Sequence, residues 1–217
     1  GVEYRLITPE GDAWVRSPYL FGTYNVSNAM AAVAAGLALG YGLDAAVQAL
    51  ATAKGAPGRF QLVDMGQDFM VVVDYAHTPE SLKGVLETAR EMTQGRVIAV
   101  FGCGGDRDKG KRPIMGQIAA QLCELTIITN DNPRTEDPEA ILDDIERGFE
   151  SVPGEHRHLR ISDRREAIRE AVARAKPGDI VVIAGKGHET YQIIGDRVNH
   201  FDDVEEAREA VLERKEG

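Results

Sequence analysis

A glycine-rich loop that also carries several cations is the stretch of this sequence best suited to chemistry. It runs from Gly102 to Arg112, G-C-G-G-D-R-D-K-G-K-R, and its other basic side chains are Arg107, Lys109 and Lys111. Glycines let a backbone approach a ligand closely, and N–H groups exposed there attract anions. The loop therefore predicts a site for phosphate or carboxylate groups.

Two common nucleotide-binding patterns do not fit this loop. Residues 105–112 form G-x-x-x-x-G-K-R, whereas a P-loop needs Ser or Thr in the last position as a Mg²⁺ ligand. Arg107 stands where the dinucleotide fingerprint requires its third glycine. A dinucleotide-dependent dehydrogenase is accordingly the least favoured function.

Three further polar segments follow predicted strands. Asp74 ends one apolar run, N-D-N-P-R-T (130–135) follows a second, and G-K-G-H-E-T (185–190) follows a third. If the strands are parallel, these segments and the glycine loop open on one edge of the sheet. Together the four segments offer both signs of charge, with the cations Arg107, Lys109, Arg134 and Lys186 and the carboxylates Asp131 and Glu189. Such a lining suits a zwitterion such as an amino acid, and a merely solvated set of charged loops is the alternative.

The order of predicted elements indicates an α/β protein. Apolar runs predict strands, over residues 69–75, 97–101, 125–129, 158–161 and 180–184. Helices are expected over residues 79–92, 113–122 (with Pro113 at the first position), 138–149, 163–175 and from 202 or 203 to about 214. This alternation predicts a mostly parallel sheet with helices on both faces. Residues 191–194 and 197–201 predict a hairpin.

The first part of the chain has a different pattern. Val2–Thr8 and Ala13–Arg16 predict two strands around a turn, followed by an alanine-rich helix at 25–39 and a second helix at 43–53. A lone hairpin is not stable in water, so we expect these strands to belong to a sheet whose remainder is absent. The segment K-G-A-P-G at 54–58 predicts a linker.

Composition argues against several classes of protein. The chain has 217 residues, of which 43% are hydrophobic, and a formal net charge of −10. Net negative charge argues against a nucleic-acid partner, and the sequence contains neither an apolar run that could span a bilayer nor a signal-peptide pattern. Two cysteines, Cys103 and Cys123, predict no disulfide framework and fit the cytoplasm. Cys103 is expected to fill space rather than to react, because no His or Asn partner is near in sequence.

Six segments of the sequence together resemble the Mur ligase family. They are G-T-Y-N-V-S-N (22–28), G-R-F (58–60), V-D-Y-A-H-T-P-E-S-L (73–82), F-G-C-G-G-D-R-D-K-G-K-R-P (101–113), D-N-P-R-T-E-D-P (131–138) and A-G-K-G-H-E-T-Y-Q (184–192). The resemblance extends from about Pro18 to the end and points to the members that add the third amino acid of the peptidoglycan peptide. It implies an ATP-dependent amide ligase that phosphorylates the D-Glu carboxylate of UDP-MurNAc-L-Ala-D-Glu. The amine of meso-diaminopimelate then attacks the acyl phosphate.

The same resemblance implies a domain organisation. Mur ligases of this type have an N-terminal UDP-binding domain, a central ATPase domain with the P-loop and a carbamylated lysine that helps to bind Mg²⁺, and a C-terminal Rossmann-like domain. This chain resembles the end of the central domain over residues 1–57 and the whole Rossmann-like domain over residues 58–217. We therefore expect a fragment that is inactive alone. Its cofactors would be ATP and Mg²⁺, and the missing part of the central domain would hold most of the Mg²⁺ site.

Roles at the ATP site follow from the matching motifs. The resemblance implies contacts to ATP by Asn25, Asn28, Arg59, Asp74 and His77. The two asparagines would lie at the adenine, Arg59 at the phosphates and Asp74 at the ribose hydroxyls. From the residues alone, Asn25 and Asn28 share a helix face and could equally cap the helix. Arg59 and Lys109 are the expected catalytic residues, with Lys109 and Lys111 on the phosphate side, and no metal ligand is expected in the chain.

Roles at the amino-acid site follow in the same way. The resemblance implies contacts to meso-diaminopimelate by Arg107, Asp131, Asn132, Arg134, Gly185 and Glu189. Arg134 would hold the distal carboxylate, which lysine lacks, and Arg107 a carboxylate of the same ligand. Gly185 and Glu189 would surround the distal amino group.

The expected partners are small molecules: ATP, meso-diaminopimelate and the UDP-MurNAc-dipeptide. No nucleic acid and no membrane are expected, and the full-length enzyme is expected to be a cytoplasmic monomer. Two alternatives remain. One is a lysine-adding or folylpolyglutamate-type ligase of the same superfamily, and the other is a non-catalytic module that binds an amino acid or a nucleotide.

Overall fold

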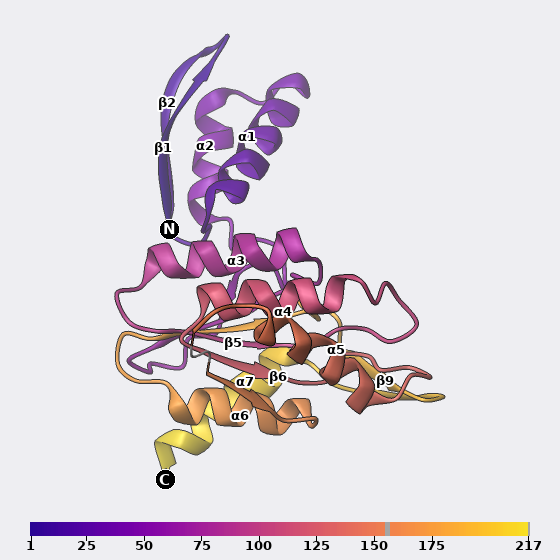
Figure 1. The fold of residues 1–217 in the computed structure, drawn as a ribbon. Coiled ribbons are helices and arrows are strands. Elements are labelled where there is room, and N and C mark those ends of the chain that lie inside the picture. Colours follow the sequence, from indigo (N-terminus) through magenta and orange to yellow (C-terminus); the bar gives the residue numbers. More distant parts are fainter. Residues whose placement is uncertain (155–156, 217) are drawn as a thin grey trace. The chain divides into compact units, whose positions relative to one another are not determined.

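The computed structural model describes residues 1–154 and 157–216, and the chain divides into two units, Gly1–Ala56 and Pro57–Gly217 (Figure 1). The division falls one residue before the boundary expected from the sequence. Residues 53–60, which join the units, contain no helix or strand and carry the Gly and Pro residues of the predicted linker.

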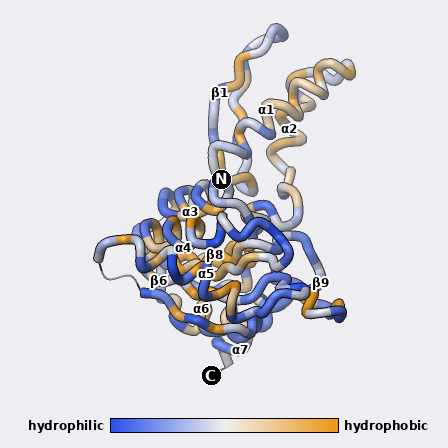
Figure 2. Tube along the Cα trace, turned by 45° about the vertical axis from the view of Figure 1, so that its right-hand side comes forward, coloured by the Kyte–Doolittle hydropathy of each residue, from blue (hydrophilic) through white to orange (hydrophobic). Residues whose placement is uncertain are grey.

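The first unit consists of a hairpin and two helices. β1 (Val2–Thr8) pairs antiparallel with β2 (Gly11–Ser17), and α1 (Thr23–Ala38) and α2 (Leu43–Thr52) follow. Figure 2 shows that both helices are largely apolar. Side chains from the hairpin and the helices share a small core, formed by Leu6, Val15, Leu20, Ala29, Val33 and Leu50.

The second unit is built on a sheet with the strand order β3-β4-β8-β5-β6-β7. Its strands are β3 (Gln61–Leu62), β4 (Met70–Asp74), β5 (Val97–Phe101), β6 (Leu125–Ile128), β7 (His158–Arg160) and β8 (Ile180–Ala184). β3 pairs antiparallel with β4, and the pairings among the others are parallel. The prediction of an α/β fold with a mostly parallel sheet is confirmed.

Helices cover both faces of this sheet, as predicted. α3 (Pro79–Met92) and α4 (Lys111–Leu122) lie on one face with α5 (Pro138–Glu150) beside α4, and α6 (Arg164–Arg174) and α7 (Asp203–Glu216) lie on the other (Figure 1). β8 follows the other strands of the sheet in sequence but lies between β4 and β5. The chain through α6 therefore returns across the opposite face to reach it.

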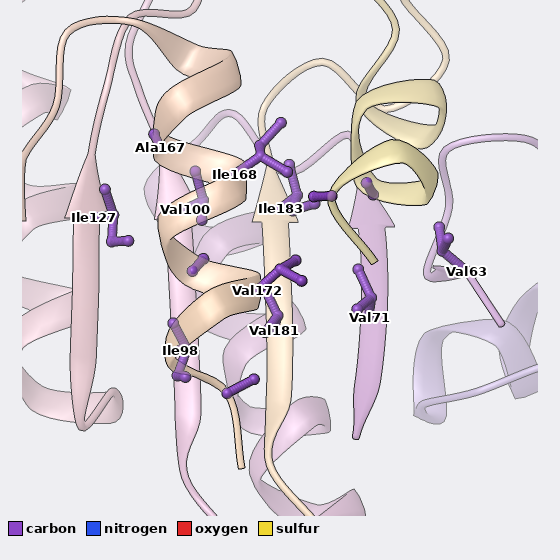
Figure 3. Packing of buried hydrophobic residues seen from close by; sticks show 14 of the residues in the cluster. Val63, Val71, Ile98, Val100, Ile127, Ala167, Ile168, Val172, Val181 and Ile183 are labelled. Carbon is purple, nitrogen blue, oxygen red and sulfur yellow. The ribbon is translucent and has the colours of Figure 1, made fainter. Parts of the chain in front are cut away.

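The covered faces explain why the central strands are continuous apolar runs rather than alternating ones. Every residue of β5 and β8 is buried. On one face, Ile168 and Val172 of α6 pack against Val100, Val181 and Ile183 of these strands (Figure 3). Each such aliphatic side chain contributes about 1.5–3 kcal/mol by leaving water.

Helix α4 begins earlier than the sequence predicts. Its first residue is Lys111, so Pro113 is the third helical residue and not the first. Asp108 Oδ1 accepts the N–H of Gly110 at 2.8 Å, and this side-chain turn starts the helix ahead of the proline. Proline is still tolerated there because the first N–H groups of a helix have no partner within it.

Candidate functional site

The carboxyl ends of four neighbouring parallel strands lie level with one another. Asp74 pairs with Ala184, Ala184 with Phe101, and Phe101 with Ile128. The loops that follow β4, β8, β5 and β6 therefore begin at one edge of the sheet, as their polar residues predicted. This edge is the candidate site.

A buried lysine organises the carboxylate side of the edge. Lys186 is fully buried, and its Nζ lies 3.1 Å from Asp131 Oδ1 and 3.1 Å from Asn132 Oδ1. It also donates to the carbonyl oxygen of Tyr191 at 2.8 Å. Asn132 Nδ2 donates in turn to Glu189 Oε2 at 3.1 Å. Burial lowers the pKa of Lys186, and the neighbouring Asp131 acts in the opposite direction.

A second buried ion pair supports this side of the site. Arg164 donates through Nε and Nη2 to Asp203 at 2.8 and 2.7 Å, and its Nη2 also donates to the carbonyl oxygen of Ala184 at 3.0 Å. Burial opposes the charge of Arg164, but Asp203 and, more weakly, Asp131 and Glu189 raise its pKa. This pair was not predicted from the sequence. Its one signal is a cation at the first position of a helix, where the macrodipole disfavours positive charge.

The cationic side of the edge is formed by Arg134 and Arg107. Arg134 Nη1 donates to the carbonyl oxygens of Gly105 at 2.9 Å and Asn132 at 3.4 Å, so its guanidinium lies against the glycine loop. Arg107 is exposed and donates through Nη1 to the carbonyl oxygen of Asp106 at 2.9 Å. Both guanidinium groups retain further N–H donors for a carboxylate.

A hairpin clamps the backbone of Arg134. It consists of β9 (Tyr191–Ile194) and β10 (Arg197–His200), which pair antiparallel as predicted. Arg134 donates its N–H to the carbonyl oxygen of Ile193 at 3.1 Å and accepts the N–H of Gly195 at 2.7 Å. Its φ of 53° is uncommon for a residue with a Cβ. These two backbone hydrogen bonds hold Arg134 in that conformation.

Not all cations of the glycine loop face the site. Arg112 is fully buried and donates to Glu136 at 2.9 and 3.1 Å and to Asp144 at 2.8 Å. Its prediction as part of the anion-binding set is therefore wrong, because its charge is used inside the fold. Lys109 Nζ lies 3.0 Å from the same Glu136. Hydrogen bonds from Arg112, and with smaller effect from Lys109, lower the pKa of Glu136 to about 2.

Asp74 is buried at the end of β4. One carboxylate oxygen accepts the N–H of Phe60 at 2.7 Å, and the other accepts the N–H of Ala76 at 2.8 Å. Burial raises the pKa of Asp74, while these two N–H groups act in the opposite direction. Each oxygen keeps a second lone pair that a hydroxyl donor could use.

Aromatic rings and a guanidinium surround the loop that follows Asp74. The Tyr75 ring lies 4.6 Å from the His77 ring and 5.1 Å from the His188 ring, and the Arg59 guanidinium carbon lies 4.8 Å above it. Lys111 Nζ donates to the carbonyl oxygen of His77 at 2.6 Å. The structure thus brings the predicted residues Arg59 and His77 together. Tyr75 and His188 were not predicted here, since isolated aromatic residues carry no local signal.

Close backbone contact holds the loop after β8 against residues 58–60. A Cβ added to Gly187, whose φ is 55°, would lie 2.6 Å from Tyr75 Cβ. A Cβ added to Gly58 would lie 2.2 Å from the Gly187 carbonyl carbon. A Cβ added to Gly185, whose φ is 122°, would lie 3.7 Å from Asp131 Oδ2, so the backbone of Gly185 comes close to this carboxylate.

Asn25 and Asn28 lie in the first turn of α1, in the first unit. Asn25 is buried and donates through Nδ2 to the carbonyl oxygen of Phe21 at 2.8 Å, and Asn28 Nδ2 donates to Asn25 Oδ1 at 3.3 Å. Gly22 is the N-cap of this helix and makes no side-chain capping bond. Neither asparagine therefore caps α1.

Both cysteines are free in this structure, Cys103 being buried and Cys123 half-buried. Burial raises the pKa of the Cys103 thiol to about 12, and its Sγ lies 3.7 Å from Met115 Sδ, which supports a space-filling role. Within residues 1–154 and 157–216, no group of three or more His, Cys, Asp or Glu side chains is placed to hold a metal ion. No helix in this part of the chain is long and apolar enough to cross a membrane.

Comparison with known proteins places this site in a family context. Residues 58–187 match the family described as "Mur ligase, glutamate ligase domain". The chain is 52% identical over 214 residues to a UDP-N-acetylmuramoyl-L-alanyl-D-glutamate–2,6-diaminopimelate ligase of Geobacillus kaustophilus, covering 99% of this chain and 43% of that protein. A ligase of the same name from Bacillus cereus is 50% identical over 214 residues, with the same shares covered. The chain thus spans less than half the length of these curated relatives.

Solved structures agree with the fold. A structure of a UDP-N-acetylmuramoyl-L-alanyl-D-glutamate–2,6-diaminopimelate ligase superimposes with a TM-score of 0.72 at 46% identity, covering 98% of this chain and 43% of that one. The folylpolyglutamate synthase of Mycobacterium tuberculosis superimposes with a TM-score of 0.63 at 19% identity, covering 96% of this chain and 46% of that one. The second likeness concerns the fold alone.

Proposed function

Because this chain belongs to the Mur ligase family, we propose that it carries the amino-acid site of an ATP-dependent ligase that adds meso-diaminopimelate to UDP-MurNAc-L-Ala-D-Glu in peptidoglycan synthesis. The observation that supports this most directly is the division of charge at the carboxyl edge of the sheet. Asp131 and Glu189 are connected there through Lys186 and Asn132, whereas the Arg134 and Arg107 side chains donate to carbonyl oxygens of the glycine loop. A ligand with ammonium and carboxylate groups at both ends complements this lining.

Each end of the ligand has a proposed partner. Asp131 and Glu189 accept hydrogen bonds from the distal ammonium group, beside the backbone of Gly185. Arg134 binds the distal carboxylate, and Arg107 binds the carboxylate at the reacting end. Lysine offers no distal carboxylate, so Arg134 would be left without its anion. This difference favours a diaminopimelate-adding ligase over a lysine-adding one.

The reaction proposed for the whole enzyme has two steps. The γ-phosphoryl group of ATP passes to the D-Glu carboxylate, which gives an acyl phosphate and ADP. The amine of the bound diamino acid then attacks the acyl carbon, and inorganic phosphate leaves as the amide forms. The residues of this chain contribute to the second step by holding the diamino acid, since orientation of an amine beside its acceptor lowers the barrier.

The matching motifs assign a second set of residues to ATP. We assign Asn25 and Asn28 to the adenine, Asp74 to the ribose, Arg59 and Lys109 to the phosphates, and His77 to the nucleotide's surroundings. We propose that most of the Mg²⁺ site lies in the part of the central domain outside this chain. Since the sequence also lacks a P-loop, the chain alone should not turn over ATP.

The proposed organisation follows from the family. Residues 1–57 are the end of a central ATPase domain, and residues 58–217 are the C-terminal domain of the ligase. The substrates are ATP, meso-diaminopimelate and the UDP-MurNAc-dipeptide. We propose that the whole enzyme acts as a monomer in the cytoplasm, where these soluble precursors would be consumed.

Calorimetric titration of the chain with meso-diaminopimelate and with L-lysine tests the amino-acid site. We expect binding of diaminopimelate in preference to lysine, and loss of that preference in Arg134→Ala. Arg169→Ala is the matched control, because Arg169 pairs with Glu166 and Glu213 on α6 and α7, away from the carboxyl edge. Equal binding of both amino acids, or a preference that survives Arg134→Ala, would refute the assignment. Binding of neither would refute the proposal that this chain alone carries the site.

A further inference from the structure

Lys186 is buried in a way that demands an explanation. Its side chain is fully removed from solvent, although lysine is among the residues least often buried. Taking an ammonium group out of water costs several kcal/mol unless partners compensate. Here the compensating groups come from distant parts of the chain: Asp131 and Asn132 in the loop after β6, and the carbonyl of Tyr191 at the start of β9.

The side chain of Asn132 is committed to internal hydrogen bonds. Its Oδ1 accepts from Lys186 Nζ at 3.1 Å and from the N–H of Ile193 at 2.9 Å. Two donors at one atom identify that atom as the amide oxygen, so Nδ2 is the group that donates to Glu189 at 3.1 Å. Lys186 and Asn132 therefore form a continuous connection from Asp131 to Glu189.

We propose that Lys186 is a positioning residue of the amino-acid site, which holds Asp131 directly and Glu189 through Asn132 so that both carboxylates face one ammonium group. This inference rests on the function proposed above. It changes the expected role of Asn132, which acts through Glu189 instead of contacting the ligand with its side chain. Lys186 itself touches no ligand.

The charges around Lys186 support an ammonium ligand. The buried cations Lys186 and Arg164 lie among three carboxylates, those of Asp131, Asp203 and Glu189. Arg164 is paired with Asp203 through Nε and Nη2. Lys186 offsets one of the two remaining carboxylates, so the group holds one more negative than positive charge. A single ammonium group from the ligand would balance it.

Hydrogen exchange tests the internal connection without any ligand. In Lys186→Met, which keeps the length of the side chain but not its charge, the N–H of Ile193 should lose protection, since its acceptor Asn132 is no longer held. Lys83→Met is the control, because Lys83 is exposed on α3 beside Glu87. Protection of Ile193 that stays unchanged in Lys186→Met would overturn the inference, whether or not the chain binds an amino acid.

Amine rescue separates positioning from simple space filling. We expect Lys186→Met to weaken binding of meso-diaminopimelate about tenfold or more, as expected for loss of charge-assisted hydrogen bonds. Lys186→Ala should be weakened likewise and restored by n-propylammonium, which replaces the missing atoms and the charge, but not by n-propanol. Restoration by both compounds, or wild-type affinity in Lys186→Met, would overturn the positioning role. If wild-type chain binds no amino acid, the proposed function fails, and the exchange experiment still decides whether the connection exists.

A measurement on the wild-type chain covers the case in which neither variant folds. The Lys186 ammonium donates to Asn132 Oδ1 and the Tyr191 carbonyl oxygen, pairs with Asp131 and is shielded from water. It should therefore give a slowly exchanging Nζ–H resonance in ¹⁵N-labelled protein, whereas that of Lys83 should exchange with solvent. Solvent-like exchange at Lys186 would overturn the inference.

Discussion

Replacing Arg112 by Met tests the conclusion that a cation in the glycine loop serves the fold and not the ligand. We expect Arg112→Met to lower the free energy of unfolding of the second unit by about 3 kcal/mol, because it breaks a buried ion pair. Lys109→Met removes a cation that pairs with the same carboxylate, only three residues away in the loop. We expect Lys109→Met to lower the free energy of unfolding by less than about 1 kcal/mol, because the Lys109 side chain is exposed.

The difference follows from burial. The Arg112 side chain is 1% exposed and makes ion pairs with Glu136 and Asp144, which are 14% and 18% exposed. Removing one partner of a buried ion pair costs about 3–5 kcal/mol because charge is left uncompensated. The lower end applies here, since both carboxylates reach some solvent and Glu136 keeps Lys109. The Lys109 side chain is 67% exposed, and pairs of that kind contribute about 0–1 kcal/mol.

Urea unfolding followed by circular dichroism measures this difference. Trp14 is the single tryptophan of the chain and belongs to the first unit, so its fluorescence reports that unit separately. The Arg112→Met transition should move to lower urea in circular dichroism. Equal destabilisation by Arg112→Met and Lys109→Met would refute the reasoning, because it would mean that burial does not distinguish the two cations.

Three further predictions follow from the same structure. Glu136→Gln should lower the free energy of unfolding by its full amount above about pH 4.5, and this loss should vanish as the pH falls towards 2, because the folded-state pKa of Glu136 is lowered from 4.5 to about 2. Unfolding curves of both proteins between pH 7 and 2.5 measure the loss, and a loss that does not change with pH would contradict the prediction. Gly187→Ala should cost more than about 2 kcal/mol, from left-handed strain and overlap with Tyr75. Gly178→Ala, with φ 81° and open space, should cost only the strain, and equal melting temperatures would argue against the overlap. Cys103, with a pKa of about 12, should react with a thiol reagent only as the protein unfolds, and immediate native labelling would show otherwise.

Local patterns were sufficient to predict the sheet and the edge at which its polar loops meet. Runs such as Val97–Phe101 and Ile180–Ala184 are apolar throughout, since a strand covered on both faces must be. The polar residues that follow them were expected to meet at one edge, and the parallel registers confirm it. The predicted start of α4 at Pro113 was wrong, because the turn formed by Asp108 starts the helix at Lys111. The preference of proline for the first helical position was therefore not decisive.

The sequence by itself determined the α/β fold class, the site edge and the presence of both signs of charge there, because these depend on neighbouring residues in the chain. Only the tertiary structure decided what each charge does. Arg112 and Arg107 are arginines of the same loop, and no local sequence signal distinguishes them. Nevertheless, Arg112 is paired with carboxylates 24 and 32 residues away, whereas Arg107 is exposed. The burial of Lys186 against Asp131 likewise depends on how the loops after β6 and β8 come together in the fold. The energy of a charge depends on its distance from solvent and from opposite charge, and folding sets both.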